Sequence, residues 1–460
     1  MRSISIARAL QRIETLAVAA ALLAAVHGAG VCRAPRQDAL LGVFEIRGEI
    51  ERLSSIPYWP GFDPRTVPTA IFDSASTYLF DHPSPPEGFE PVEGKPGVHR
   101  FAGQHPAVSR NGRTRLGDVM TATSVLRERS RLGERYSTRD LAGIVIHEQF
   151  HVFQAAKHPS WRPNDAFLLV YPLETAESLY LRNVEKEAFR RAVASSDEKT
   201  AAGWAKEGLK YRARRLEPLG EQIAGYEMEL QRFEGISEYI ETLARGNDPL
   251  WLLAATSGIA PSGVRDLGYV EGRLISFLLD RLDTRWKERM ESGEAQYPEE
   301  LLAAAVAGVE TSAGFGADEL EKLRSDAETA IAGWNGEKKR LVSSFHAAPG
   351  LTIEIIAETT PLGVRMFEPL AMENLGGGEI FHKVFFSAAN DKGAVRVRNT
   401  PCISYMDSTY RLTKVTITAL PAKPEIDAAA GAFTYDAGGV SIDFKGAKVT
   451  PGDRRWTIEL

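Results

Sequence analysis

Three patterns of apolar and polar residues follow one another along this chain. In residues 44–106, short β-type runs such as Thr77–Phe80 alternate with turns rich in Pro and Gly, which predicts strands and turns. Residues 137–344 have apolar positions at helical spacing and few prolines, which predicts a helical region. Beyond Gly350, apolar and polar residues alternate between Gly-rich turns. This last pattern is typical of a β-sandwich.

The first thirty residues have a different pattern. Arginines come first, the apolar run Leu16–Val26 follows, and then the small residues Gly28, Ala29 and Gly30. This order is typical of a secretory signal peptide, and the run of about 11 apolar residues is shorter than the ~20 that span a bilayer. We therefore expect residues 1–30 to be removed and the mature protein to be periplasmic or extracellular, with no membrane span.

Composition and cysteine content narrow the possible partners. The 460 residues are 43% hydrophobic and carry 55 Lys and Arg against 61 Asp and Glu, a net charge of −6. Such a chain has no global positive field for nucleic acid phosphates, so we expect no nucleic acid partner. The two cysteines, Cys32 and Cys402, could form a disulfide in an oxidising compartment or remain free.

The most informative segment is the pentad His147-Glu148-Gln149-Phe150-His151. Ser137 and Asp140 offer a helix capping box ahead of it, and apolar residues follow at helical spacing, so the pentad should lie on a helix. Two histidines four positions apart share a helix face and can bind one Zn²⁺. Glu148 can then accept the proton of a metal-activated water that attacks a carbonyl.

A catalytic zinc needs a third protein ligand. The predicted helix Glu221–Ala244 has an apolar face that Glu227 and Glu234 interrupt. A carboxylate on such a face is costly unless it is paired or bound to metal, and we therefore expect Glu234 to be the third ligand. Glu238, one turn later, could orient a ligand histidine. Glu174 and Glu177 are competing third ligands.

His147-Glu148-x-x-His151 followed by Glu234-Gly235-x-x-Glu238-Tyr239 resembles the gluzincin zinc metallopeptidases, over about Leu116–Leu282. The resemblance implies His147, His151 and Glu234 as zinc ligands and Glu148 as general base. The best-known members have their ligand glutamate about 20 residues after the second histidine, nearer to where Glu174 and Glu177 lie. The Glu-Gly-x-x-Glu-Tyr form in members with long helical insertions favours Glu234.

The resemblance also implies a fold. We expect an α+β protein in which residues 31–345 form a zincin-like catalytic region, with a β-rich lobe (31–136) and a helical lobe (137–345). Residues 346–460 would form the β-sandwich-like module. The segment Asp118–Val125 is the candidate for an edge strand that binds an extended substrate, and Tyr269 and Arg273 are candidate donors to a developing oxyanion.

Other charged residues favour ordinary surface roles. Glu185, Glu187 and the cluster Arg212–Arg215 are expected to form solvated ion pairs.

Two classes of function fit these patterns. The leading hypothesis is an exported zinc-dependent hydrolase, a metallopeptidase that cleaves a peptide or protein substrate with Glu148 as general base. The alternative is a non-catalytic envelope binding or assembly protein with a structural or degenerate zinc site. A hydrolase that acts on another ester or amide is a variant of the first hypothesis.

Overall fold

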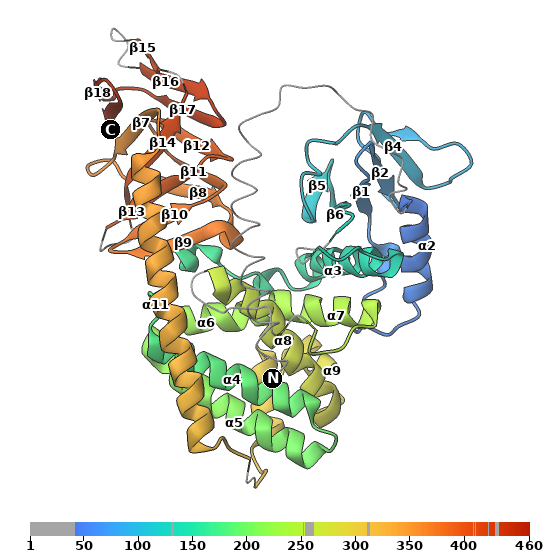
Figure 1. Cartoon of the computed structure of the whole chain (residues 1–460). Coiled ribbons are helices and arrows are strands. Elements are labelled where there is room, and N and C mark those ends of the chain that lie inside the picture. Colours follow the sequence, from blue (N-terminus) through green and yellow to red (C-terminus); the bar gives the residue numbers. More distant parts are fainter. Residues whose placement is uncertain are drawn as a thin grey trace. The chain divides into compact units, whose positions relative to one another are not determined.

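The computed structural model describes residues 42–129, 133–251, 253, 262–310, 313–407, 409, 411–421, 423–427 and 432–460. The predicted signal peptide and Cys32 lie outside these residues. The described part is a mixed α+β fold with a six-stranded sheet, a group of helices and two further sheets (Figure 1). None of the described helices has the length and apolarity that a membrane span requires.

The first sheet has the strand order β3-β4-β2-β1-β6-β5. Its strands are β1 (Thr69–Phe72), β2 (Ser76–Phe80), β3 (Glu90–Pro91), β4 (Val98–Ala102), β5 (Gly112–Leu116) and β6 (Val119–Val125). One face shares an apolar core with helices α2 (Val43–Leu53) and α3 (Thr138–Lys157). The prediction of strand and turn from residue 44 is therefore wrong at its start, where buried Val43, Ile46, Ile50 and Leu53 recur at helical spacing.

The predicted edge strand is not at an edge. Asp118–Val125 becomes β6, which pairs with β1 on one side and β5 on the other. A tight turn at Gly117, which has a φ of 57°, folds β5 back outside β6, so that β5 is the edge strand. The turn is possible because glycine tolerates a positive φ. The periodicity of β6 alone does not show that another strand pairs outside it.

The helical region follows. It comprises α3, α4 (Ala176–Ala194), α5 (Glu198–Leu216), α6 (Gly220–Leu230), α7 (Ile236–Arg245), α8 (Ser262–Leu282), α9 (Trp286–Glu291), α10 (Pro298–Val306) and α11 (Ala317–Ala347). The predicted helix Glu221–Ala244 is present as α6 and α7, joined by a π-helical turn over Gln231–Gly235. This extra-wide turn, often found at functional sites, contains Glu234.

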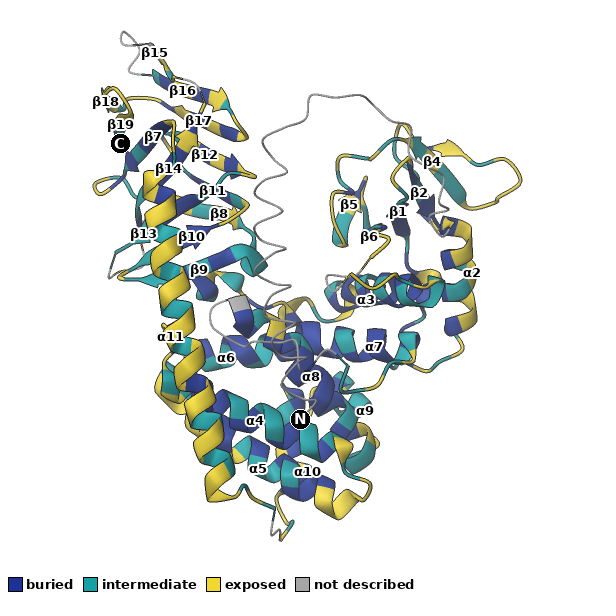
Figure 2. Ribbon diagram, viewed as in Figure 1, coloured by how far each residue is buried: buried dark blue, intermediate teal, exposed yellow. Residues whose placement is uncertain are grey.

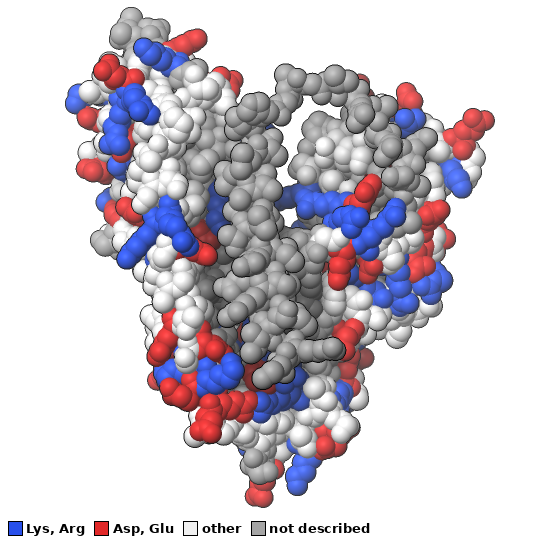
Figure 3. Space-filling view, in the orientation of Figure 1, with Lys and Arg blue, Asp and Glu red and all other residues white. Residues whose placement is uncertain are grey.

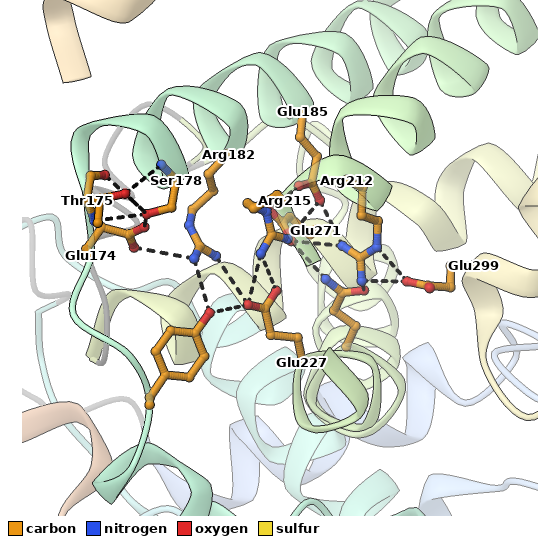
Figure 4. Close-up of polar contacts among 12 residues, drawn as sticks. Glu174, Thr175, Ser178, Arg182, Glu185, Arg212, Arg215, Glu227, Glu271 and Glu299 are labelled. Carbon is orange, nitrogen blue, oxygen red and sulfur yellow. Dashed lines mark hydrogen bonds and ion pairs between the residues drawn. The ribbon is translucent and has the colours of Figure 1, made fainter. Parts of the chain in front are cut away.

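A buried ion network joins helices α4, α5, α6, α8 and α10 (Figure 4). Arg212 and Arg215 of α5 contact Glu185 of α4, and Arg215 also binds Glu227 of α6, at N–O distances of 2.7–2.8 Å. Arg212 lies 3.4 Å from Glu271 of α8. The prediction of solvated pairs is therefore wrong for Glu185 and these arginines, because they are buried and the facing charges satisfy one another inside the protein. Figure 2 shows buried positions along α4, α5 and α8. Glu187 does pair near the surface, with Arg190 and Arg191.

The remaining residues form two β-sheets with a shared apolar core. Their orders are β18-β19-β7-β14-β13-β10-β9 and β15-β16-β17-β12-β11-β8. The strands are β7 (Leu351–Ile356), β8 (Gly363–Phe367), β9 (Met372–Gly376), β10 (Glu379–His382), β11 (Phe385–Asn390), β12 (Gly393–Arg398), β13 (Cys402–Met406), β14 (Leu412–Leu420), β15 (Glu425–Asp427), β16 (Ala432–Ala437), β17 (Val440–Phe444), β18 (Lys448–Thr450) and β19 (Arg455–Glu459). Two sheets around one core match the expected β-sandwich-like module. Cys402 is buried in β13.

Candidate metal centre

The cap and the core packing of helix α3 fix which way the side chains of the pentad point. Its N-terminus has the expected capping box, in which Ser137 Oγ accepts from Asp140 N at 3.1 Å and Asp140 Oδ2 accepts from Ser137 N at 2.9 Å. One side of α3 packs into the core shared with β6 and α7. His147 and His151 lie on a second buried side, while Glu148 is partly exposed.

Glycines bring the π turn close to α8. A Cβ on Gly235 would lie 2.5 Å from Gly272 Cα and 2.8 Å from Gly268 O, and a Cβ on Gly272 would lie 2.5 Å from Gln231 O. Real Cβ atoms are not found at such distances, so only glycine permits this backbone approach. The contact places Glu234 of the π turn beside Arg265 and Tyr269 of α8.

Three ligand-type atoms converge where α3 meets the π turn. His147 Nε2 lies 3.1 Å from His151 Nε2, and Glu234 Oε2 lies 3.0 Å from His151 Nε2 and 3.7 Å from His147 Nε2. Ligand atoms on a tetrahedral zinc at about 2.0–2.1 Å would be about 3.3 Å apart. The observed separations bracket that value, so these residues fit a zinc ion.

Each of these side chains has its other polar atom held by a neighbour. Gln154 Nε2 donates to Phe233 O at 3.0 Å, so Gln154 Oε1 accepts from His151 Nδ1 at 2.8 Å. His147 Nδ1 lies 3.1 Å from Glu241 Oε2, which can only accept a hydrogen bond when ionised. With the proton on Nδ1, each histidine would direct the lone pair of Nε2 at the convergence point.

The carboxylate of Glu234 is held in the same way. Its Oε1 accepts a hydrogen bond from Arg265 Nη2 at 2.5 Å, which leaves Oε2 for the histidines. Arg265 in turn binds Asp165. Three acceptor atoms at this spacing repel one another unless a proton or a metal cation lies among them, and a bound metal ion would meet this electrostatic condition.

The pKa shifts in the site reflect the same charges. Burial alone would lower the pKa of His147, but hydrogen bonds to Glu234 and Glu241 raise it well above its usual value. Burial acts to raise the pKa of Glu234, yet Arg265 and His151 hold it well below its usual value. Burial raises the pKa of Glu148. The centre thus favours positive charge among its ligands while Glu148 binds a proton more readily than a free glutamate.

The structure separates the other predicted residues. Tyr269 stacks on His147 at a ring distance of 5.9 Å. Arg273 is fully buried and donates to Glu238 Oε1 at 3.1 Å and to Trp251 O, so it supports the core rather than lining the site. Glu174 binds Ser178 and Arg182, and Glu177 pairs with Arg324.

Among the residues that the structure describes, one group of possible metal ligands contains both His147 and His151. Glu234 is their shared neighbour, and Glu174 and Glu177 belong to neither candidate group among the residues that the structure describes. The second candidate group contains His147, Glu238 and Glu241, on the Nδ1 side of the histidine.

The chain matches no protein-family model, no curated protein and no solved structure. The functional argument therefore rests on the site itself.

Sequence reasoning missed three supporting residues. Gln154, Glu241 and Arg265 hold the proposed ligands. Glu238, which was expected to orient one of the two histidines, lies farther from them, with Oε2 4.0 Å from His147 Nδ1. Glu241 could have been found from its position seven residues after Glu234, which is again the same face of an α-helix. Arg265 had no comparable signal in the sequence.

Proposed function

We propose that this chain is an exported zinc metallopeptidase with a zincin-like catalytic region in residues 31–345. The observation that carries the proposal is the convergence of His147 Nε2, His151 Nε2 and Glu234 Oε2, with Glu148 next to His147 on the same helix. Figure 3 shows Lys and Arg interspersed with Asp and Glu on the face in view.

The chain's own residues divide the chemistry. His147, His151 and Glu234 would hold the zinc, and Gln154, Glu241 and Arg265 fix their orientation. The bound ion would supply Lewis acidity toward a water molecule and the substrate carbonyl. Glu148 takes the proton of the attacking water and passes it to the leaving amine, a role that suits a carboxylate whose pKa burial has raised.

Tyr269 would stabilise the charge that develops on the substrate. Its ring lies against His147, and burial together with Glu234 raises the pKa of its hydroxyl well above the usual value, which keeps it protonated. A neutral phenol can donate to the substrate oxyanion. An extended peptide would add to the free edge of β5, which replaces β6 in the expected role.

The test is the substitution Glu148→Gln in the mature chain. Because the amide cannot accept the proton, cleavage of a peptide mixture should fall by about 10²- to 10⁴-fold while zinc stays bound. Glu177→Gln, with the same charge change at an exposed pair, should cleave normally. Undiminished hydrolysis by Glu148→Gln would remove the proposed mechanism. Zinc-loaded wild-type protein that cleaves nothing would instead support the binding-protein hypothesis.

A further inference from the structure

Arg113 of the edge strand β5 contacts the helix that carries the proposed metal ligands His147 and His151. Its Nη1 donates to His151 O at 3.0 Å, and its guanidinium lies 5.2 Å from the centre of the Phe233 ring. The Phe233 ring stacks in turn on the His151 ring at 4.3 Å. Arg113 and Phe233 therefore form one stack with His151, a proposed zinc ligand.

The sheet register sets the direction of Arg113. It lies opposite Ala122 of β6, and Ala122 belongs to the apolar core that β6 shares with α3. Cross-strand partners share a face of the sheet, so Arg113 points to the α3 face. The outer edge of β5 pairs with no other described strand. A peptide along that edge would thus pass the guanidinium.

This cation has no carboxylate partner within ion-pair distance among the residues that the structure describes. Neighbouring arginines do: Arg110 pairs with Glu368 at 3.5 Å, and Arg265 binds Glu234 and Asp165. Burial and the like charge of Arg162 lower the pKa of Arg113, whereas the charges of Glu234 and Glu148 act to raise it. Among the described residues, the guanidinium of Arg113 makes one hydrogen bond, to His151 O, which leaves most of its five N–H donors available.

A second cation reinforces the first. Arg162 follows the short helix Pro159–Trp161, is exposed, and is in none of the ion pairs of the described residues. The like charges of Arg113 and Arg162 repel each other, and neither is in an ion pair among the described residues. An anion bound near both would offset that repulsion. A carboxylate is the anion that a peptide substrate can supply, and a guanidinium binds it through two parallel hydrogen bonds.

We infer that Arg113, assisted by Arg162, recognises a carboxylate on the substrate, so that the site selects peptides carrying a negative charge near the scissile bond. The carboxylate belongs either to an Asp or Glu side chain or to the C-terminus of the peptide. This inference rests on the proposed function and narrows its substrate class.

Direct binding tests the inference without hydrolysis. The zinc-loaded Glu148→Gln protein is titrated calorimetrically with three versions of one N-acetylated peptide: neutral and C-amidated, C-amidated with one Asp, and neutral with a free C-terminal carboxylate. One of the two charged versions should bind more tightly than the neutral one, and which of them does identifies the source of the carboxylate. The preference should weaken as salt concentration rises.

Substitutions in that background assign the preference to residues. Arg113→Met keeps an unbranched chain against Phe233 and should weaken binding of the preferred charged peptide by about ten- to hundred-fold, with the neutral peptide unchanged. Arg162→Met, at an exposed position, should reduce the same preference with no effect on folding. Arg113→Lys should restore part of it. Arg396→Met, at an exposed position of β12, is the control for net charge. It should bind all three peptides as tightly as the Glu148→Gln protein does.

The outcomes separate the inference from the proposed function. Equal binding of all three peptides, or a preference that survives both Arg113→Met and Arg162→Met, would overturn the inference alone. Loss of neutral-peptide binding in Arg113→Met would also overturn it, because the arginine would then only support the fold. Absence of zinc and of all peptide cleavage in wild-type protein would overturn both.

Discussion

At the scale of single residues, the centre depends on pairs of side chains rather than on three ligands alone. Each proposed ligand has one polar atom directed inward and the other bound by Gln154, Glu241 or Arg265. A free imidazole or carboxylate rotates and loses that freedom when it binds a metal. Because these partners already fix the ligands, metal binding costs less conformational entropy.

Glu241 provides a direct test of this arrangement. Glu241→Gln should weaken zinc binding by about 10- to 100-fold, since the amide no longer supports the Nδ1–H of His147 as strongly. Zinc affinity is measured by competition with a chelator of known affinity. Glu238→Gln is the matched control, because Glu238 lies farther from Nδ1 and is bound to Arg273. A larger effect from Glu238→Gln would show that it, and not Glu241, holds the histidine.

The sequence predicts the site residues whose spacing along a helix is fixed by their role as metal ligands. It predicts fewer of the residues that tertiary packing brings to the site. His147, His151 and Glu234 follow from the pentad and from a carboxylate on an apolar face, and the structure brings them together. Arg265 approaches Glu234 only because glycines allow two backbones to touch. Such a contact depends on two distant segments, which no local pattern specifies.

At the scale of elements, the π turn between α6 and α7 is the part that positions Glu234. It interrupts a segment that the sequence pattern predicts as one helix. Its backbone at Gly235 packs against Gly268 and Gly272 of α8. The same scale explains the wrong edge strand: periodicity identifies β6 as a strand, but a hairpin turn decides which strand is outermost.

Gly235→Ala tests the backbone contact. The added methyl group would collide with Gly272 and Gly268, so the free energy of unfolding should fall by about 1–3 kcal/mol and zinc affinity should fall with it. Urea unfolding measures the first effect. Gly225→Ala on α6 is the control, because nothing lies within 4 Å of the new methyl group, and it should stabilise the helix by about 0.5–1 kcal/mol. Equal behaviour of the two variants would contradict the close-packing account.

At the scale of the whole molecule, the site lies against two supporting structures. The buried ion network reaches it through Gln231 of the π turn, whose Nε2 donates to Glu271 Oε2 at 2.8 Å. An apolar cluster joins Leu230, at the end of α6, to Met372 and Ile380 of the β module. Asn374 Nδ2 of that module also donates to Tyr171 O at 2.8 Å. The β module therefore contributes to the packing around the helical region.

Glu271 makes the network sensitive to pH. Burial, and next the charge of Glu185, raise the pKa of Glu271 to about 7, above its usual 4.5. Folding thus favours the protonated acid, and its contribution to stability is full below pH 4.5 and is lost as the pH rises through 7. Glu271→Gln cannot ionise, so its stability relative to wild type should be greater at pH 8 than at pH 5, by on the order of 1–3 kcal/mol.

Urea unfolding of both proteins at the two pH values measures this difference. Glu177→Gln, at an exposed pair, should show no comparable change. A difference between Glu271→Gln and wild type that does not vary with pH would mean that Glu271 is ionised throughout.

The central claim is that His147, His151 and Glu234 bind one zinc ion. Elemental mass spectrometry of the mature chain, from about Val31 onward, after dialysis tests it most directly. We predict close to one zinc per chain, lost in Glu234→Gln and retained in Glu174→Gln. Wild-type protein without zinc even after zinc is supplied, or zinc lost in Glu174→Gln but retained in Glu234→Gln, would contradict the account.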